Sequence, residues 1–545
     1  MRIRYAVVIP LFIAGVAIAL PSRAQSLSDD SACANLAKLK LPHTTIVSAK
    51  PVAAAPATVP GSAPLDVPAR CEVRAVTRPS ADSEIVFEVW LPLAGWNGSY
   101  RQQGNGGFAG AVNRAALIDP IRRGYATAAT DDGHDATKTP QGTFAVGHPE
   151  KVIDFGYRAV HDTAEQAKAI VTAFYGKPPV RSYFTGCSDG GREALMEAQR
   201  FPEDFDGILA GAPANDWSHL FTAFVWNELA LSKDAAHRIP AEKLPVIQKA
   251  VVAACDASDG VKDGLISNPA ACQFDPAVIT CKSADGNDCL TPPQVDTLKA
   301  LYAGPKNPRT GQRIFDGLVK SGTEALPANW ALWILGTAPG RSAQAGFGVS
   351  YYRDVVFEKP GWDVRSMDFD RDVRVSDEKV APIFNATNPD LRSFRAHGGK
   401  LLQYHGWGDS AIVPTSSIEY HEAVRSFLSS VPDPRSSSTS VDDFYRLFMV
   451  PGMAHCGQGV GPVHFGNDAA PAPGATGPDR DVFAALEAWV ERGVAPSRLI
   501  GSGPSPLEPT TTMTRPLCPY PQQPLYKGSG NTNDAANFVC ATPAK

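Results

Sequence analysis

The stretch from Tyr183 to Glu193 restricts the fold of this chain more than any other. An apolar strand runs into a Gly-x-Ser-x-Gly turn centred on Ser188, and a helix-forming run follows from Ala194 to Gln199. Gly186 and Gly190 suit this turn, since a sharp strand-to-helix connection leaves no room for a Cβ at those points. The order of strand, turn and helix predicts a nucleophile elbow with Ser188 as the nucleophile, and the alternative is an ordinary glycine-rich turn.

The N-terminus predicts export. Arg2 and Arg4 precede an apolar run from Tyr5 to Leu20, and a small-residue cleavage pattern ends at Ala24. These features are typical of a secretory signal peptide, so we exclude residues 1–24 from the fold and expect a secreted or periplasmic protein. The alternative is an uncleaved membrane anchor, for which the apolar run is short.

The ten cysteines of the chain agree with export, because disulfides persist in oxidising compartments. Proximity in sequence indicates four pairs and leaves a fifth: Cys33 with Cys71, Cys255 with Cys272, Cys281 with Cys289, Cys518 with Cys540, and Cys187 with Cys456. Zinc binding is a poor alternative to disulfides, because no Cys-x-x-Cys or Cys/His pair at ligand spacing has a second such pair nearby.

Composition limits the partners. The chain has 545 residues, of which 43% are hydrophobic and 20% charged, with a formal net charge of −5. This length allows two or more domains, or one large domain with an insertion. The net charge gives no basic surface for nucleic acid, and beyond the N-terminus no stretch is long and apolar enough to cross a membrane. We therefore expect the protein to bind neither nucleic acid nor a membrane. The oligomeric state is left open.

Alternating strand and helix patterns predict an α/β fold. Residues 71–76, 85–92, 124–130 and 206–213 are rich in strand-forming residues, and residues 157–175 have helical periodicity. The order of these elements, with the elbow among them, implies a mostly parallel sheet with helices on both faces.

Three other segments carry expectations of their own. Residues 49–70 contain repeated prolines and are expected to form an extended arm with poor strand prospects. The glycine-rich loop Gln103–Phe108 follows a strand, where Gly106 is positioned to donate a backbone N–H to an oxyanion, and the alternative is a tight turn. The loop Asp131–His134 has the residue types of a metal site, but we favour polar side chains satisfied within a post-strand loop.

Residues 215–395 are interpreted as an inserted domain. They include four cysteines and five tryptophans and have little strand character, whereas the sheet pattern resumes at residues 400–406. Active sites of α/β sheets open at the carboxyl ends of the strands, so we expect this insertion to be a lid that supplies aromatic walls. The catalytic domain then comprises residues 25–214 and 396–545.

An acidic loop within the predicted lid has the composition of a calcium site. Asp256, Asp259 and Asp263 crowd into a glycine-containing loop. Such carboxylates suit Ca²⁺, which takes six to eight oxygen ligands. The loop departs from the EF-hand, since Val261 stands where that loop needs an acid or amide and Ala270 where it needs a glutamate. The alternative is a solvated acidic loop.

The partners expected for the nucleophile follow the predicted lid. Asp409 comes after the strand pattern at residues 401–405, and His455 comes after the strand pattern at residues 444–450. The order Ser, Asp, His along the chain is the one expected for an α/β-hydrolase, with the acid and the base each in a loop after a strand. The alternatives for these two roles are His405, Asp442 and Asp443.

The elbow Gly186–Gly191, the Asp409 loop and the pair His455-Cys456 together resemble the tannase/feruloyl esterase family, which includes the mono(2-hydroxyethyl) terephthalate hydrolases. The resemblance covers nearly the whole mature chain. It implies an α/β-hydrolase fold with a large lid and a disulfide between Cys187 and Cys456. It also implies a structural calcium ion in the lid, bound by the positions matching Asp256, Asp259, Val261, Asp263 and Leu265, with Val261 and Leu265 contributing backbone carbonyls.

Members of this family cleave esters of aromatic acids, so the resemblance implies a serine esterase with a small aromatic ester as substrate. We expect Ser188 to attack the ester carbonyl, His455 to act as base and Asp409 to orient it. The backbone N–H groups of Asp189 and Gly106 are expected to hold the oxyanion. We rank hydroxycinnamoyl esters first, galloyl esters second and terephthalate monoester third. A hydrolase fold that only binds ligands is the remaining alternative, and the intact Ser, Asp and His argue against it.

Overall fold

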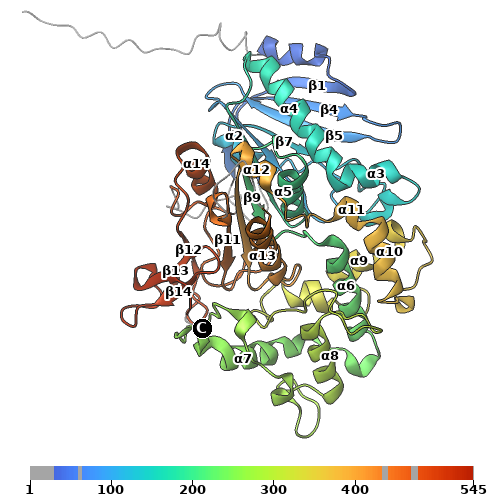
Figure 1. Cartoon of the computed structure of the whole chain (residues 1–545), viewed down its shortest axis with the longest axis vertical. Helices are drawn as coiled ribbons and strands as arrows, with labels where there is room; N and C mark the ends of the chain where they lie inside the picture. Colours follow the sequence, from blue (N-terminus) through green and yellow to red (C-terminus); the bar gives the residue numbers. More distant parts are fainter. Residues whose placement is uncertain (1–29, 59–63, 432–439, 468–476, 544–545) are drawn as a thin grey trace, which may run out of the picture.

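The computed structural model describes residues 30–58, 64–431, 440–467 and 477–543. The predicted signal peptide lies outside them. A nine-stranded sheet forms the centre of the fold, with the strand order β1-β4-β5-β7-β6-β8-β9-β10-β11 (Figure 1). Its strands are β1 (Thr44–Val52), β4 (Arg70–Thr77), β5 (Ile85–Pro92), β6 (Ser99–Gln103), β7 (Ala126–Thr130), β8 (Arg181–Cys187), β9 (Gly207–Gly211), β10 (Lys400–Gly406) and β11 (Tyr445–Val450).

The part of this sheet from β7 to β11 is parallel, and β1, β4 and β5 extend it as antiparallel neighbours. The mostly parallel sheet and the α/β class predicted from the sequence are therefore confirmed. Parallel strands place their carboxyl ends at one edge, where the loops that follow β6, β8, β10 and β11 gather.

The proline-rich segment 49–70 differs from its prediction. β1 continues through Pro51 to Val52, and two short strands, β2 (Ala55–Ala57) and β3 (Leu65–Val67), pair with each other beyond it. The expectation of poor strand prospects is wrong here. β1 is the edge strand of the sheet, and an edge strand tolerates proline because half of its N–H positions have no ladder partner.

Helices cover both faces of the sheet. On one face, α4 (Ala159–Tyr175), α5 (Asp189–Arg200) and α13 (Thr415–Ser430) bury side chains such as Ala164, Leu195 and Val424 against the strands. On the other face, α14 (Val482–Arg492) buries Leu486 and Trp489. The shorter helices α2 (Ile118–Arg122) and α3 (Pro149–Ile153) lie in connections between these elements. None of the described helices combines the length and apolar character needed to cross a bilayer.

The segment between β9 and β10 is helical and contains no strand, and the structure describes it throughout. Its helices are α6 (Trp217–Leu231), α7 (Leu244–Cys255), α8 (Pro292–Ala303), α9 (Ala343–Ser350), α10 (Arg371–Lys379), α11 (Ala381–Phe384) and α12 (Arg392–His397). Figure 1 shows α6 to α10 gathered beyond one end of the sheet. They share an apolar core that includes Phe108 and Phe144 from the strand-end loops. The boundary of a separate lid domain stays a prediction.

Two C-terminal hairpins lie beside these helices. The first pairs β12 (Leu499–Pro504) with β13 (Thr512–Leu517), and the second pairs β14 (Gln523–Tyr526) with β15 (Phe538–Ala541). Arg515 of β13 donates a hydrogen bond of 2.6 Å to Asp263, so the hairpins are joined to the acidic loop after α7.

Close backbone contacts at the start of α5 set the positions of β8, β9 and α5. A Cβ on Gly186 would lie 2.4 Å from the carbonyl oxygen of Gly190. A Cβ on Gly191 would lie 2.3 Å from the carbonyl oxygen of Gly211. Both neighbours are backbone atoms, which cannot move aside without displacing a strand or a helix.

We predict that Gly191→Ala destabilises the protein by about 1–3 kcal/mol, because the added methyl group clashes with β9. Thermal unfolding followed by circular dichroism measures the effect. The matched control is Gly346→Ala on α9, where a Cβ meets nothing within 4 Å and alanine favours the helix. Equal melting temperatures for the two variants would contradict this account of the elbow.

Candidate active site

Ser188 stands in the sharp turn between β8 and α5. Its backbone angles, φ 68° and ψ −120°, are ones that a non-glycine residue adopts only when the surrounding structure enforces them. The Ser188 N–H donates to the Gly211 carbonyl at 3.0 Å, and the Ala214 N–H donates to the Ser188 carbonyl at 3.1 Å. The turn therefore has the strained geometry of the nucleophile elbow that the sequence predicts.

His455 and Asp409 lie beside this serine. The Nε2 atom of His455 is 3.0 Å from the Oγ atom of Ser188, and its Nδ1 atom is 2.8 Å from Oδ2 of Asp409. The second Asp409 oxygen accepts hydrogen bonds from the N–H groups of Ala411 and Ile412. The structure thus brings together the three residues predicted to form a catalytic triad.

The ionisation of Asp409 follows from these contacts. Burial alone would raise its pKa, but attraction to His455 and a hydrogen bond from His405 hold the pKa below the ordinary value. Asp409 is therefore a carboxylate at neutral pH. A carboxylate in this place fixes the orientation of the His455 ring and stabilises the imidazolium form.

The alternative residues for the acid and the base lie elsewhere. His405 is buried with its Nε2 atom 3.2 Å from Asp409 and its Nδ1 atom 2.7 Å from Ser417, so it contacts the acid rather than Ser188. Asp442 and Asp443 belong to a short turn that precedes β11, at the opposite end of the strand from His455. The sequence did not reveal the contact of His405 with Asp409, although their spacing of four residues was visible.

Gly106 and Asp189, the predicted oxyanion donors, both line the cavity at Ser188. Asp189 is the first residue of α5, where backbone N–H groups have no intrahelical acceptor. Within the described residues, neither of these two N–H groups donates to a protein acceptor. The Gly190 N–H donates to the Asn105 carbonyl at 2.9 Å, which ties the Gly106 loop to the helix.

The predicted disulfide pairs are confirmed. The bonds are Cys33–Cys71, Cys187–Cys456, Cys255–Cys272, Cys281–Cys289 and Cys518–Cys540. The Cys187–Cys456 bond joins residues 269 positions apart and links the neighbour of Ser188 to the neighbour of His455. It is a covalent connection between the two loops that carry these residues.

The cavity at Ser188 has a volume of about 290 Å³. Its apolar walls come mainly from the segment between β9 and β10: Trp217, Leu220, Phe221, Phe224, Trp333 and Phe347. The Trp333 ring packs against His455 with ring centroids 5.2 Å apart. The Asp189 side chain adds no free charge, because Arg192 donates to its carboxylate at 2.6 Å. The described lining contains no lysine or arginine.

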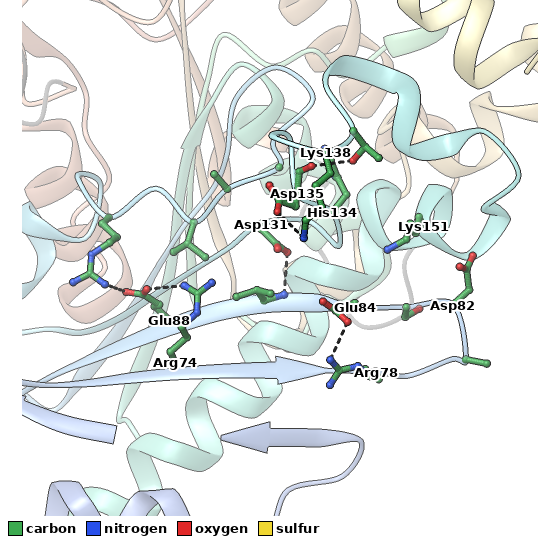
Figure 2. Close-up of a pocket in the computed structure, with 18 residues that line it drawn as sticks. Arg74, Arg78, Asp82, Glu84, Glu88, Asp131, His134, Asp135, Lys138 and Lys151 are labelled. Atoms are coloured by element: carbon green, nitrogen blue, oxygen red, sulfur yellow. Dashed lines mark hydrogen bonds and ion pairs between the residues drawn. The ribbon is translucent and has the colours of Figure 1, made fainter. Parts of the chain in front are cut away.

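A larger cavity of about 740 Å³ lies away from the triad and has a charged lining (Figure 2). Three of its basic side chains are paired with acids: Arg74 with Glu88, Arg78 with Glu84, and Lys138 with Asp135. Lys151 donates to the Gly133 carbonyl instead. Burial raises the pKa of Asp131 in its wall to about 7, against the opposing effect of hydrogen bonds from Gly133 and Val86. This cavity contains no residue of the triad.

The predicted calcium loop follows α7. Burial raises the pKa of Asp256 and of Asp259, and repulsion from Asp263 adds to the shift in both. Within the described residues, the carbonyl oxygens of Val261 and Leu265 accept no hydrogen bond. The three carboxylates are not among the groups whose ligand atoms all lie within 4.8 Å of one another. The match to Ca²⁺ therefore lies in the donor types, carboxylate oxygens and free carbonyl oxygens, and not in a close cluster of carboxylates.

Fold and site together define an α/β-hydrolase with the Ser-His-Asp arrangement of an esterase. Residues 71–541 match the family model described as tannase and feruloyl esterase. The chain belongs to the tannase and feruloyl esterase family, as its motifs indicated, and it is a carboxylic ester hydrolase.

Individual relatives agree with this assignment. The chain is 43% identical to an uncharacterized esterase from Xanthomonas campestris pv. campestris, with 94% of this chain and 92% of the relative covered. It is 34% identical to mono(2-hydroxyethyl) terephthalate hydrolase from Piscinibacter sakaiensis, with 90% and 87% covered. The crystal structure of feruloyl esterase B from Aspergillus oryzae superimposes with a TM-score of 0.83 at 28% identity, covering 94% of this chain and all of that one.

We predict that replacing Cys187 and Cys456 together by serine lowers kcat for ester hydrolysis at least about tenfold, because Ser188 and His455 lose their covalent connection. By the chain-entropy model the loss of stability is up to about 5 kcal/mol. The matched control replaces Cys281 and Cys289 by serine. It removes a disulfide between residues only 8 positions apart and should keep kcat. Steady-state kinetics and thermal unfolding of both variants give the comparison, and an unchanged kcat in the first would contradict the prediction.

Proposed function

We propose that this protein hydrolyses esters of aromatic carboxylic acids, hydroxycinnamoyl esters before others, through an acyl-enzyme on Ser188. The observation that supports this most directly is the contact of Ser188 with His455 at 3.0 Å, in the lining of an apolar cavity walled by aromatic side chains. An aromatic acyl group fits such walls, since aromatic rings prefer stacked and edge-to-face contacts with one another.

The first half of the reaction forms the acyl-enzyme. As the Ser188 Oγ atom attacks the ester carbonyl, its proton moves to Nε2 of His455, and Asp409 stabilises the resulting imidazolium. The N–H groups of Asp189 and Gly106 donate to the oxyanion of the tetrahedral intermediate. His455 then gives the proton to the leaving alkoxide, and the ester C–O bond breaks.

The second half releases the acid. His455 takes a proton from water as the water oxygen attacks the acyl carbonyl, and the same two N–H groups again stabilise the oxyanion. The intermediate collapses, the bond from the acyl carbon to Oγ breaks, and the proton returns to Ser188. The products are the aromatic acid and the regenerated enzyme.

The lining of the cavity supports the order of substrates. A second carboxylate, as in a terephthalate monoester, needs a cation when it is buried, and no lysine or arginine is among the described lining residues. A galloyl group has three hydroxyls, each of which needs a polar partner when buried. A hydroxycinnamoyl group has fewer polar atoms and a longer apolar body, which suits walls such as Phe221 and Trp333.

We predict that Ser188→Ala lowers kcat for methyl ferulate by at least about 1,000-fold, while the fold seen by circular dichroism is kept. The natural protein assayed on methyl ferulate, methyl gallate and mono(2-hydroxyethyl) terephthalate should show kcat/KM falling in that order. Hydrolysis that survives the substitution would contradict the mechanism. A rate on the terephthalate monoester above the other two would contradict the order of substrates.

We also propose that the acidic loop after α7 binds a structural calcium ion. The residues that would hold it are Asp256, Asp259 and Asp263, with the carbonyl groups of Val261 and Leu265. When bound, the ion supplies positive charge that offsets the repulsion among the three carboxylates. Arg515 already neutralises part of that charge through its bond to Asp263, and it connects the loop to the C-terminal hairpin.

We predict that protein purified without chelator contains about one equivalent of calcium, and that EDTA lowers its melting temperature. A ligand at 100 times its dissociation constant adds about 2.7 kcal/mol of stability. Asp259→Ala should remove both the bound calcium and the effect of EDTA. Asp296→Asn is the control, since Asp296 is exposed on α8 outside the loop. Metal-free protein with the stability of the natural preparation would contradict the proposal.

Export is part of the proposed function. Five disulfides support residence in an oxidising compartment, and the expected signal peptide at residues 1–24 provides the route. We propose that the mature protein is secreted or periplasmic.

A further inference from the structure

The loop that carries Gly106 is held by a carboxylate of α5. The Oε2 atom of Glu193 accepts a hydrogen bond of 3.0 Å from the Asn105 N–H, and its Oε1 atom lies 3.4 Å from the Asn105 side-chain amide. A Cβ on Gly104 would lie 2.6 Å from Glu193, so the loop approaches this side chain closely. The place of the Gly106 N–H therefore depends on where the Glu193 carboxylate lies.

Glu193 belongs to a buried group with an excess of acid. The carboxylates of Asp132, Asp189 and Glu193 offer oxygens that all lie within 4.8 Å of one another, and all three residues are buried. Asp132 comes from the loop after β7, whereas the other two are on α5. Three ionised carboxylates this close in a buried site would repel one another strongly.

Among the described residues, one guanidinium lies beside the group, and most of its donors serve other acceptors. Arg192 donates its Nε–H to Asp189 at 2.6 Å. Its other two nitrogens donate to the carbonyls of Gly156 and Phe155 at 2.7 and 3.0 Å. Asp189 thus has a partner for its charge, whereas within the described part of the chain no ion pair involves Asp132 or Glu193.

Within this group of three carboxyl groups, Asp132 is the one whose ionisation costs much free energy. It is fully buried, and neither of its carboxylate oxygens accepts a hydrogen bond from a described residue. The expectation from the sequence that polar side chains in this loop are satisfied is wrong for Asp132. A buried carboxylate without a donor is expensive, whereas a protonated carboxyl can donate to a neighbouring carboxylate.

We propose that Asp132 is a positioning residue for ester hydrolysis: its protonated carboxyl donates a hydrogen bond to Glu193, and this bond holds the Gly106 loop in the place where its N–H meets the oxyanion. The proposal rests on the proposed function, since it assigns a cause to the geometry of that oxyanion site. The pKa of Asp132 agrees with this proposal: burial raises it well above its ordinary value, and repulsion by Glu193 adds to the shift.

This arrangement makes activity depend on pH on the alkaline side. Because the pKa of Asp132 is raised in the folded protein, the shared proton is present below that pKa and is lost as pH rises through it. Two adjacent carboxylates then repel, and the Gly106 loop is displaced. The charged or titratable groups that face Asp132 and its loop are Asp131, His134, Lys151, Asp154, Asp189, Arg192 and Glu193.

Asp131 provides a matched control, because it is the preceding residue in the same loop. It lines the charged cavity in Figure 2, where one carboxylate oxygen accepts from the Val86 and Gly133 N–H groups. An asparagine keeps that oxygen and removes the titration. Asp131→Asn therefore tests whether an alkaline loss of activity belongs to the loop in general or to Asp132.

The experiment measures kcat and KM of the full mature chain on p-nitrophenyl acetate from about pH 5 to about pH 10, where the natural protein should lose kcat on the alkaline side. This ester reports hydrolysis whichever aromatic acid is preferred. Asp132→Asn, which keeps a donor that cannot ionise, should hold kcat within about threefold near neutrality and abolish the alkaline loss. Asp132→Ala should lower kcat about 10- to 100-fold with KM within about threefold, as for loss of an oxyanion donor.

An alkaline loss that is unchanged in Asp132→Asn, or abolished in Asp131→Asn, would overturn the proposal. So would a metal ion bound by the natural protein and absent from Asp132→Asn, since a cation would then replace the shared proton. If Asp132→Ala does not fold, the pH profile of Asp132→Asn still decides. A natural protein that does not hydrolyse the ester at all would contradict the proposed function itself, and the inference with it.

Discussion

The close approach of three backbone segments around Ser188 is the constraint on which the rest of the site depends. β8 enters the turn, α5 leaves it, and the loop after β6 lies against the first turn of the helix, with Gly186 and Gly190 at the contacts. Gly191 packs against the backbone at the end of β9. Side chains at these points would push the segments apart. The contact gives Ser188 its unusual backbone angles and leaves the N–H groups of Gly106 and Asp189 without an acceptor among the residues that the structure describes. The proposed nucleophile and the proposed oxyanion donors thus both depend on one packing arrangement.

Other segments of the chain supply the remaining parts of the site. The loops after β10 and β11 supply Asp409 and His455, and the Cys187–Cys456 bond connects the histidine loop to the elbow. The helical segment between β9 and β10 supplies most of the apolar wall, and its Trp333 packs on His455. Under the proposed function, the loops of the sheet carry the chemistry and the helices between β9 and β10 carry most of the substrate contacts. Substrate preference can therefore change within the family without a change to the triad.

The two buried aspartates Asp409 and Asp132 differ in what surrounds their carboxyl groups. Asp409 is ionised because two histidines and two backbone N–H groups stabilise its charge. Asp132 is similarly buried, but no described residue donates to its carboxylate oxygens, and the raised pKa of its carboxyl agrees with the proposed neutral form. The difference between the two residues is the set of donors around each carboxylate, since both are removed from water.

Local patterns in the sequence were enough to predict the elbow, the order of Ser188, Asp409 and His455, and the disulfide pairs. Turn chemistry, strand periodicity and cysteine spacing are short-range signals. The pairing of β1 as an edge strand, the contact of His405 with Asp409 and the contact of Asp132 with Glu193 appeared only in the tertiary structure. Each depends on which distant segment packs alongside. Burial and hydrogen-bond donors then decide whether a proline is tolerated and whether a carboxyl keeps its proton, and no single stretch of sequence contains that information.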